Sequence, residues 1–236
     1  MVYVFERPGA RSIWTLDNTA NDAWGVNNGT NNNVTFAATT PPTHVTQSYN
    51  YGQYGIFSPI NSSDMTKFIA ITGSATLNAT SFTIGFWIKT TQNWDGTIFH
   101  NWRNDSGWYG WDARVYGSDG KLNMLITSDG NVDNIYSSSA VNTGSWVHLM
   151  VAVSAGVGAT VYRDFKYDLY TAWAKTVRFS GNAHYPAIGV RRDAGTSGSN
   201  DPFSGNIKDV MYFPYCMTAG QVKQFSAFYK GRLAFV

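Results

Sequence analysis

Aromatic and polar side chains alternate along one segment of the sequence, from Trp94 to Tyr116. Aromatic rings stack on the apolar faces of sugar rings, while Asp and Arg side chains form directional hydrogen bonds with hydroxyl groups. We therefore predict a shallow glycan site in which Trp108 stacks on a sugar, Asp112 accepts hydrogen bonds from hydroxyls, and Arg114 either orients Asp112 or donates to ring oxygens. Trp102 and Tyr116 are predicted to flank this site.

An alternative for the same segment is packing. If residues 107–116 form a strand, successive side chains point to opposite faces, so one set of residues faces the core and the other faces solvent. The first set is Tyr109, Trp111, Ala113 and Val115, and the second is Trp108, Gly110, Asp112 and Arg114. The aromatic density then reflects a core or an interface, and both explanations stay open.

Catalytic signatures are weak. Retaining glycosidases need two carboxyl groups about 5 to 5.5 Å apart, yet Glu6 is the only glutamate. The pairs Asp105 with Asp112 and Asp129 with Asp133 fall in turn-like sequence, where Asp is a common turn residue. The segment from His100 to Arg114 holds the residue types of a polysaccharide lyase without a diagnostic spacing. We expect a non-catalytic module; a polysaccharide-degrading lyase or glycosidase is the alternative.

The remaining reactive side chains favour structural roles. His148 alternates with Trp146 and Met150 on an apolar segment, which indicates a buried sheet histidine. His44, His100 and His184 are too scattered to predict a metal site, and the single cysteine, Cys216, excludes an internal disulfide.

Composition excludes several partners. The net charge is +2 without a basic run, so nucleic acid is not an expected partner. No apolar run reaches about 18 residues, so membrane insertion is not expected either. The N-terminal residues lack the pattern of a secretory signal. The sequence leaves the location unknown; a virion surface and the extracellular space reached by a non-classical route are the two options considered.

The elements that position these side chains read as strands. Aromatics make up 16% of the chain and charged residues only 14%, a composition typical of an all-β domain. In residues 81–89, Phe82, Ile84, Phe86 and Ile88 share one face at period two and are predicted core residues. The predicted strands are Ser12–Leu16, Val34–Phe36, Phe68–Ile71, Ser81–Lys89, Thr97–Trp102, Gly107–Tyr116, Lys121–Thr127, Trp146–Val153, Ala159–Phe165, Ala187–Val190 and Asn206–Phe213.

Turns and one helix complete this prediction. Asn18–Asn33 and Asp193–Asp201 are rich in turn residues and are predicted loops, and Asp129-Gly130 is a turn signal. Thr218 and Gln221 have the spacing of a helix capping box. We predict one two-sheet antiparallel β-sandwich domain (a jelly roll) over residues 1–236, with its core at about 12–229. The short C-terminal helix is expected to cover one edge.

Four segments in order resemble the laminin-G-like (concanavalin A-like) jelly-roll family: Trp14–Asp17 with Ala20–Asp22 and Asn27–Thr30, Ser81–Lys89, Gly144–Val151, and Phe203–Tyr212 leading to Met217-Thr218. The resemblance implies two antiparallel sheets packed face to face, with a concave face that often holds glycans. It also implies a short Asp-Gly hairpin after the strand that follows Trp146-Val147-His148. Here the strand runs on through Asp164-Phe165 into an aromatic segment, so we predict that this hairpin differs from the Asp-Gly hairpin of the family.

The resemblance also bears on calcium, the one cofactor considered. Asp22 or Asp17, with backbone carbonyls of residues 27–30, are the predicted ligands of a structural calcium ion. Many relatives carry an acidic residue where Lys208 stands, and an ammonium group cannot ligate a cation. A solvated loop is the alternative.

The function predicted from these features is a non-catalytic carbohydrate-binding or surface-recognition module with glycans or polysaccharide as partners. Many aromatic residues also suit assembly, because Tyr and Trp are enriched at protein interfaces. A homo-oligomer or a virion surface component of a phage or virus is therefore a second hypothesis, which is compatible with the first.

Overall fold

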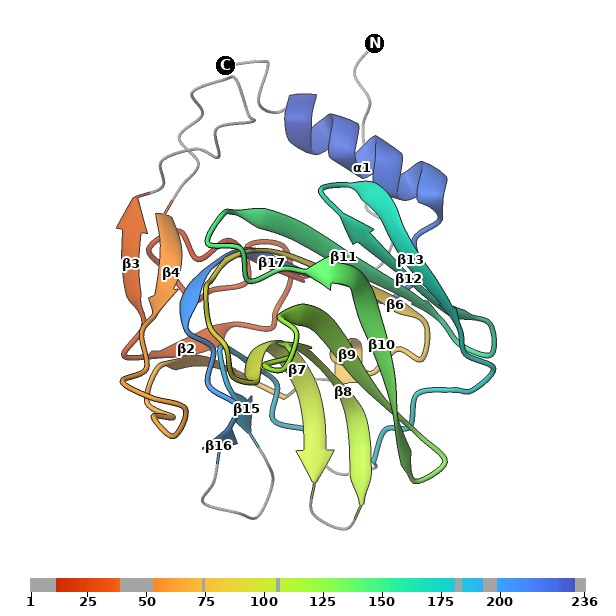
Figure 1. The fold of residues 1–236 in the computed structure, drawn as a ribbon, viewed down its shortest axis with the longest axis horizontal. Helices are drawn as coiled ribbons and strands as arrows, with labels where there is room; N and C mark the ends of the chain where they lie inside the picture. Colours follow the sequence, from red (N-terminus) through yellow and green to blue (C-terminus); the bar gives the residue numbers. More distant parts are fainter. Residues whose placement is uncertain are drawn as a thin grey trace.

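The computed structural model describes residues 12–38, 53–73, 75–104, 107–180, 184–192 and 199–231. Two antiparallel sheets form the two layers of a sandwich (Figure 1). All strand pairs in the described residues are antiparallel, which confirms the predicted antiparallel β-sandwich.

The larger sheet has eight strands. In spatial order they are β13 (Lys166–Ala172), β12 (Gly158–Arg163), β11 (Val147–Ser154), β6 (Phe82–Lys89), β17 (Gly205–Phe213), β4 (Gln53–Phe57) and β3 (Thr35–Ala38), with β1 (Ser12–Trp14) paired to β17.

The second sheet has seven strands. Their order is β10 (Asn131–Ala140), β9 (Lys121–Ser128), β8 (Trp108–Val115), β7 (Gly96–Asn104), β14 (Ala187–Ile188), β5 (Phe68–Ile71) and β2 (Gly29–Asn32). A separate pair, β15 (Arg191–Arg192) with β16 (Ser199–Asn200), contacts β7, and a short 3₁₀ helix covers Ala75–Leu77.

The main core lies between the two sheets. The predicted face of β6 is confirmed, since Phe82, Ile84, Phe86 and Ile88 are all fully buried there. The opposite face of β6 is also buried, because α1 (Ala219–Gly231) covers the outer side of the eight-stranded sheet. The helix therefore lies over a face and not over an edge as predicted (Figure 1).

A second apolar cluster joins α1 to the sheet. Its members are Ile13, Met150, Ala152, Tyr162, Met211, Phe213, Met217, Val222 and Phe225. The predicted capping box is confirmed at the start of α1: the Gln221 main-chain N–H donates to Thr218 Oγ1 at 3.3 Å, and the Thr218 N–H donates to Gln221 Oε1 at 2.8 Å.

Turn chemistry explains two hairpins. Asp129 and Gly130 both have positive φ, 46° and 81°, and join β9 to β10 as a two-residue turn that suits Asp-Gly. Asp164 and Phe165, with φ of 49° and 63°, join β12 to β13 in the same way. The prediction that a strand continues through Phe165 was therefore wrong at its end, because a two-residue turn begins after Arg163.

Several elements were not predicted. β2 lies inside the predicted loop Asn18–Asn33, and β4, β10 and β13 are strands that the sequence pattern did not indicate. β2 depends on pairing with β5 and on a close approach that only glycine allows: a Cβ on Gly29 would lie 2.5 Å from Ile69 Cγ2. Within the predicted loop Asp193–Asp201, Ser199–Asn200 form β16, while residues 193–198 lie outside the described residues.

No helix in the described part of the chain is long and apolar enough to cross a membrane.

Candidate functional site

The outer face of the seven-stranded sheet, which is the face turned away from the other sheet, carries most of the predicted site residues. Trp111, Ala113 and Val115 point from β8 into the core, so Asp112 and Arg114 point outward. Asp112 stands opposite His100 on β7, and Arg114 stands opposite Thr97 on β7 and Asn123 on β9. The predicted alternation along β8 is therefore confirmed.

Asp112 is fully buried, although its face was predicted to meet solvent. Thr97 Oγ1 donates to its Oδ2 at 3.2 Å, whereas its Oδ1 is buried without a hydrogen-bond partner. Burial raises the pKa of Asp112 to about 7, and the positive charges of Arg191 and Arg114 oppose that rise. This carboxyl group is thus held near its midpoint at neutral pH.

Ion pairs surround this buried acid. Arg114 Nη1 lies 2.9 Å from Asp95 Oδ2 and 3.5 Å from Asp201 Oδ2. Arg191 Nη1 lies 2.9 Å from the same Asp201 oxygen. The network joins β8 to β15 and to the segment after β16. It places residues distant in the sequence over Asp112 and explains why that side chain does not reach solvent.

An aromatic and amide rim lies beside Arg114. Its guanidinium carbon is 5.6 Å from the ring centroid of Tyr116, which in turn is 5.9 Å from the ring of Tyr136. Asn123 Nδ2 donates to Asn134 Oδ1 at 3.1 Å, and Asn123 Oδ1 is buried without a partner. Asn134 is exposed, and both tyrosines are partly exposed. Rings, amides and a guanidinium group thus meet at one end of β8.

Sequence analysis missed part of this rim. Tyr136 and Asn134 lie on β10, which was not predicted as a strand, and the register places Tyr136 opposite Asn123. The signal present was the Asp129-Gly130 turn, since a predicted strand before such a turn implies a partner strand after it.

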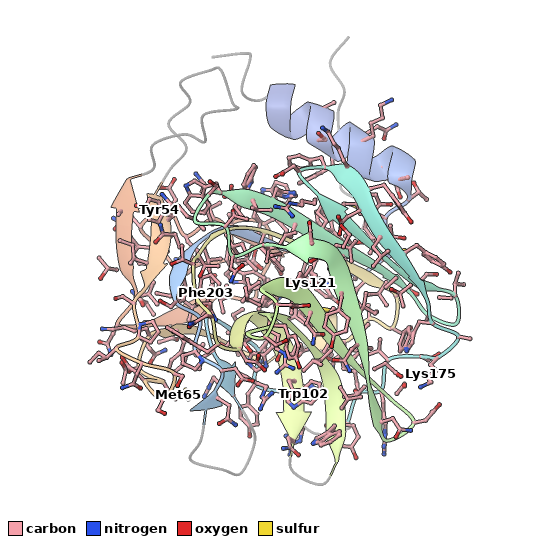
Figure 2. All side chains as sticks on the ribbon, in the orientation of Figure 1. Tyr54, Met65, Trp102, Lys121, Lys175 and Phe203 are labelled. Atoms are coloured by element: carbon pink, nitrogen blue, oxygen red, sulfur yellow. The ribbon has the colours of Figure 1, made fainter. Side chains whose placement is uncertain are left out.

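The other predicted aromatics lie elsewhere. Trp108, 46% exposed, is opposite Asn104 at the far end of β8, and Trp102 is buried opposite Gly110. At the usual rise per residue of a strand, Trp108 and Tyr116 are separated by about 26 Å. Figure 2 labels Trp102 and Lys121, which lie at different places along this part of the sheet. The structure thus groups Asp112, Arg114 and Tyr116 and separates them from Trp108.

The residues weighed for catalysis have structural contacts. His100 is fully buried, and the main-chain N–H groups of Trp102 and Arg192 point at its two ring nitrogens, each at 3.1 Å. Burial and the charges of Arg191 and Arg192 hold the pKa of His100 well below its usual value. Asp133 accepts hydrogen bonds from Lys175 at 2.7 Å and Trp173 at 3.0 Å. Glu6, His44 and Asp105 lie outside the described residues.

His148 occupies the structural position predicted for it. Its ring stacks on Phe165 with centroids 3.9 Å apart, and Trp87 lies 5.0 Å away. Burial lowers the pKa of His148 to about 3, so the ring is neutral at ordinary pH.

The predicted calcium ligands lie in the loop before β2. The Asp22 carboxylate accepts main-chain N–H groups: Oδ1 accepts from Ile13, Trp24 and Gly25 at 2.9 to 3.1 Å, and Oδ2 accepts from Asn27 at 3.2 Å. The carboxylate thereby organises the loop.

Asp17 is exposed, and its charge acts on Lys208. Lys208 itself is buried, which lowers its pKa, whereas Asp209 and Asp17 oppose that shift. Within the described ranges, no three His, Cys, Asp or Glu side chains are grouped so that they could hold a metal ion. The calcium site stays a prediction.

Solved structures show the same fold. Domain 4 of AbnA, an extracellular arabinanase from Geobacillus stearothermophilus in complex with arabinotriose, matches with a TM-score of 0.63 and 17% identity, over 91% of this chain and 97% of that domain. The CBM40 of the Ruminococcus gnavus IT-sialidase bound to α2,3 sialyllactose matches with a TM-score of 0.53 and 13% identity, over 63% of this chain and 83% of that chain.

The binding domain of the Paraclostridial Mosquitocidal Protein 1 matches with a TM-score of 0.67 and 12% identity, over 92% of this chain. This chain spans only 51% of that binding domain. At such identities these likenesses concern the fold. No curated protein matches the sequence.

Family membership rests on the sequence itself. The family described as "Concanavalin A-like lectin/glucanases superfamily" matches residues 63–223, about two thirds of the chain. These residues include β5 to β17, and so include strands of both sheets. With this match and two antiparallel sheets packed face to face, the chain belongs to the concanavalin A-like lectin/glucanases superfamily.

Proposed function

We propose that the protein is a non-catalytic module that binds neutral or weakly charged glycans on the outer face of the seven-stranded sheet. The observation that carries the proposal is the rim at the end of β8, where Arg114 lies against Tyr116 beside Tyr136 and the Asn123–Asn134 amide pair. Aromatic rings contact sugar faces, and amide and guanidinium groups bind hydroxyls, so one ligand class uses all of these groups.

Each side chain has a role in this proposal. Tyr116 and Tyr136 contact sugar rings, and Asn134 exchanges hydrogen bonds with hydroxyls. Arg114, held by Asp95, donates to ring or hydroxyl oxygens. Asp112 is buried next to Arg114 on the same face of β8 and does not contact the ligand directly.

Trp108 belongs to the site only for a long ligand, whereas Trp102 is too buried to stack on a sugar. Trp108 is exposed but about 26 Å from Tyr116 along β8, so one oligosaccharide must follow the strand to reach both residues. The predicted stacking on Trp108 is therefore proposed for extended chains alone.

Relatives of the same fold support this choice of ligand class. The arabinanase domain was solved with arabinotriose and the sialidase domain with sialyllactose, so this fold holds oligosaccharides in two different proteins. The near-neutral charge of the chain suits neutral ligands.

A glycan array on the purified protein tests the proposal, followed by calorimetry with the strongest ligand. Tyr136→Ala should weaken binding by about 1 to 3 kcal/mol and leave the fold intact, because Tyr136 is partly exposed. Trp111→Ala is the contrasting variant: this fully buried ring should cost about 3 to 5 kcal/mol of stability. Normal glycan binding by a stable Tyr136→Ala protein would show that the rim is not the binding site. Binding to no glycan on the array would contradict the proposed function.

Trp108→Ala separates the two parts of the predicted site. It should leave short ligands unaffected and weaken long ones, with unchanged stability because the ring is exposed. If Trp108→Ala unfolds the protein, or binds long ligands normally, Trp108 has no part in binding.

One observation favours the enzymatic alternative. A buried carboxyl group whose pKa is raised to about 7, within a network of charges, is a pattern found at active sites. Incubation with polysaccharides followed by assays for new reducing ends and unsaturated products tests this alternative. Products that disappear in Asp112→Asn would establish an enzyme and overturn the non-catalytic proposal.

Assembly is the second hypothesis that an observation favours. Edge strand β13 carries Tyr167 and Tyr170, which are 66% and 46% exposed. Exposed tyrosines on an edge strand suit contact with another chain. Size exclusion with light scattering tests the assembly hypothesis, because the measured mass of a trimer or larger ring would be a multiple of 26.1 kDa. The virion surface role stays a prediction.

A further inference from the structure

A second group of charged and aromatic side chains lies apart from the rim. The guanidinium carbon of Arg192 is 5.5 Å from the ring centroid of Phe68 and 5.8 Å from that of Tyr185. Arg103 approaches the same Tyr185 ring at 5.9 Å. We call these four residues the arginine–tyrosine patch. Because two guanidinium groups share one ring, their carbons are no more than about 12 Å apart.

Phe68 of the patch lies on the same outer face as the rim but on another strand, β5. Ala70 on β5 is opposite Ala187 on β14, which is opposite His100 on β7. Opposite residues share a face, so Phe68, two residues before Ala70, faces outward as well. The two neighbouring residues of β15 have different partners. Arg191 forms an ion pair with Asp201, whereas Arg192 contacts the ring of Phe68.

Charge distinguishes the patch from the rim. Arg114 and Arg191 have carboxylate partners within 2.9 Å. Arg192 contacts two rings and forms no ion pair with any residue that the structure describes. The buried ring of His100 accepts the main-chain N–H of Arg192, and burial together with the arginine charges lowers its pKa and keeps it neutral. Within the described part of the chain, no carboxylate is therefore paired with Arg192, and an anionic ligand would neutralise its charge.

The shape of the cation indicates which anion. A guanidinium group presents a planar fork of donors that matches a carboxylate with two parallel hydrogen bonds. Tyr185 is 38% exposed, and its ring lies next to that guanidinium group. A ligand that joins a carboxylate to a hydroxyl-bearing ring uses all of these groups together.

We propose that the arginine–tyrosine patch is a second binding site, which takes the carboxylate of an acidic sugar. Arg192 binds the carboxylate, Phe68 holds the guanidinium plane in place, and Tyr185 contacts the sugar ring. Uronic acids and sialic acids share this chemistry. The site is separate from the rim proposed for neutral glycans.

Calorimetric titration tests the proposal with 3′-sialyllactose and a galacturonic acid trisaccharide, and with lactose as the neutral counterpart. We expect at least one acidic probe to bind more tightly than lactose, and more weakly as salt is added. The probe that binds better distinguishes a sialic acid site from a uronic acid site.

Variants locate the binding. Arg192→Gln should lower the affinity for the acidic probe about ten- to a hundredfold, and Arg192→Lys should lower it less, because lysine keeps the charge without the fork. Arg178→Gln is the matched control: Arg178 also lies over a tyrosine, 4.6 Å from Tyr109, and loses the same charge outside the patch. It should bind the acidic probe like the parent protein.

The outcomes separate this proposal from the first. The proposed patch site is contradicted if the acidic probes bind no better than lactose. It is also contradicted if Arg192→Gln and Arg178→Gln lose the same affinity for the acidic probe. Acidic binding that survives Tyr136→Ala but not Arg192→Gln supports it. An array that reports neutral glycans alone leaves the rim standing and removes the patch. If Arg192→Gln lowers the melting temperature, Arg192→Lys decides the result, since it keeps the charge over the rings.

Discussion

Asp112 is the residue whose ionisation matters most to the outer face. Its carboxyl group is buried between Thr97 and two arginines, and its Oδ1 has no hydrogen-bond partner. Burial favours the neutral form, and the nearby guanidinium groups favour the charged form. The balance leaves the pKa raised, so the folded state binds this proton more strongly than the unfolded chain does.

The stability contributed by this protonated carboxyl should be lost as pH rises. Because the pKa is 3.8 in a model peptide and about 7 in the fold, this contribution is complete below pH 4 and decreases up to about pH 7. Each unit of difference corresponds to about 1.4 kcal/mol. Urea unfolding of the parent and of Asp112→Asn from pH 4 to pH 8 should show the parent weakening relative to the variant. A constant difference between the two proteins across that range would mean that Asp112 is ionised normally.

Asp22 organises the loop before β2 through four main-chain N–H groups. Asp22→Asn replaces one oxygen by a donor and removes the charge, so we expect a loss of about 1 to 3 kcal/mol in unfolding free energy. Asp129→Asn is the control, because the turn at Asp129-Gly130 accepts Asn equally well. A neutral Asp22→Asn variant would contradict this account of the loop.

Calcium binding by the loop before β2 can be tested with a chelator. Because the Asp22 oxygens already accept main-chain hydrogen bonds and Lys208 lies near Asp17, we expect EDTA to leave the melting temperature unchanged at fixed ionic strength. A melting temperature that falls with EDTA and recovers with calcium would establish the ion that the family resemblance predicts.

At the scale of elements, the β12–β13 hairpin combines an unfavourable backbone with favourable packing. Phe165 has a φ of 63°, a conformation that costs a residue other than glycine about 1 to 2 kcal/mol. Its ring stacks on His148 at 3.9 Å and lies 6.4 Å from Phe225 of α1. The hairpin thus keeps its two-residue length because the aromatic contacts between the sheet and the helix offset the backbone cost.

Two substitutions separate these opposing effects. Phe165→Ala removes the ring and keeps the strain, whereas Phe165→Gly removes both, so the glycine variant should be about 1 kcal/mol more stable than the alanine variant. At Tyr167, an exposed position inside β13, glycine should instead be the less stable of the two. Urea unfolding measures both pairs. If alanine is better than glycine at both positions, the backbone at Phe165 is not strained.

At the scale of the whole molecule, the two apolar clusters share their strands. β11 contributes Leu149 to the core between the sheets and Met150 to the cluster beneath α1, and β17 divides Val210 and Met211 in the same way. Neither cluster can therefore lose its packing without disturbing the other. We propose on this basis that the chain forms one domain, as its length and composition predicted.

One domain predicts one cooperative transition. Tryptophan fluorescence and far-ultraviolet circular dichroism should give coincident curves in urea, because Trp111 lies in the core between the sheets and α1 packs on the other side of one of those two sheets. A helix signal that is lost at lower urea than the fluorescence change would show that α1 unfolds independently and would contradict the proposal.

Local patterns in the sequence determined much of the fold. The period-two face of β6, the alternation of β8, the Asp129-Gly130 turn and the Thr218 cap were all predicted, because each depends on neighbouring residues. The four family segments identified the superfamily, which the match over residues 63–223 confirms.

Only the tertiary structure decided where the outer-face residues lie. Asp112 is buried because Asp201, 87 residues after Arg114, and Arg191 form ion pairs above it. Tyr136 joins Tyr116 because β10 pairs with β9, and its Asn- and Ser-rich sequence carries no strand pattern of its own. Such contacts depend on which distant segments share a sheet. Local periodicity does not encode that pairing, and so the candidate site could be predicted only in part.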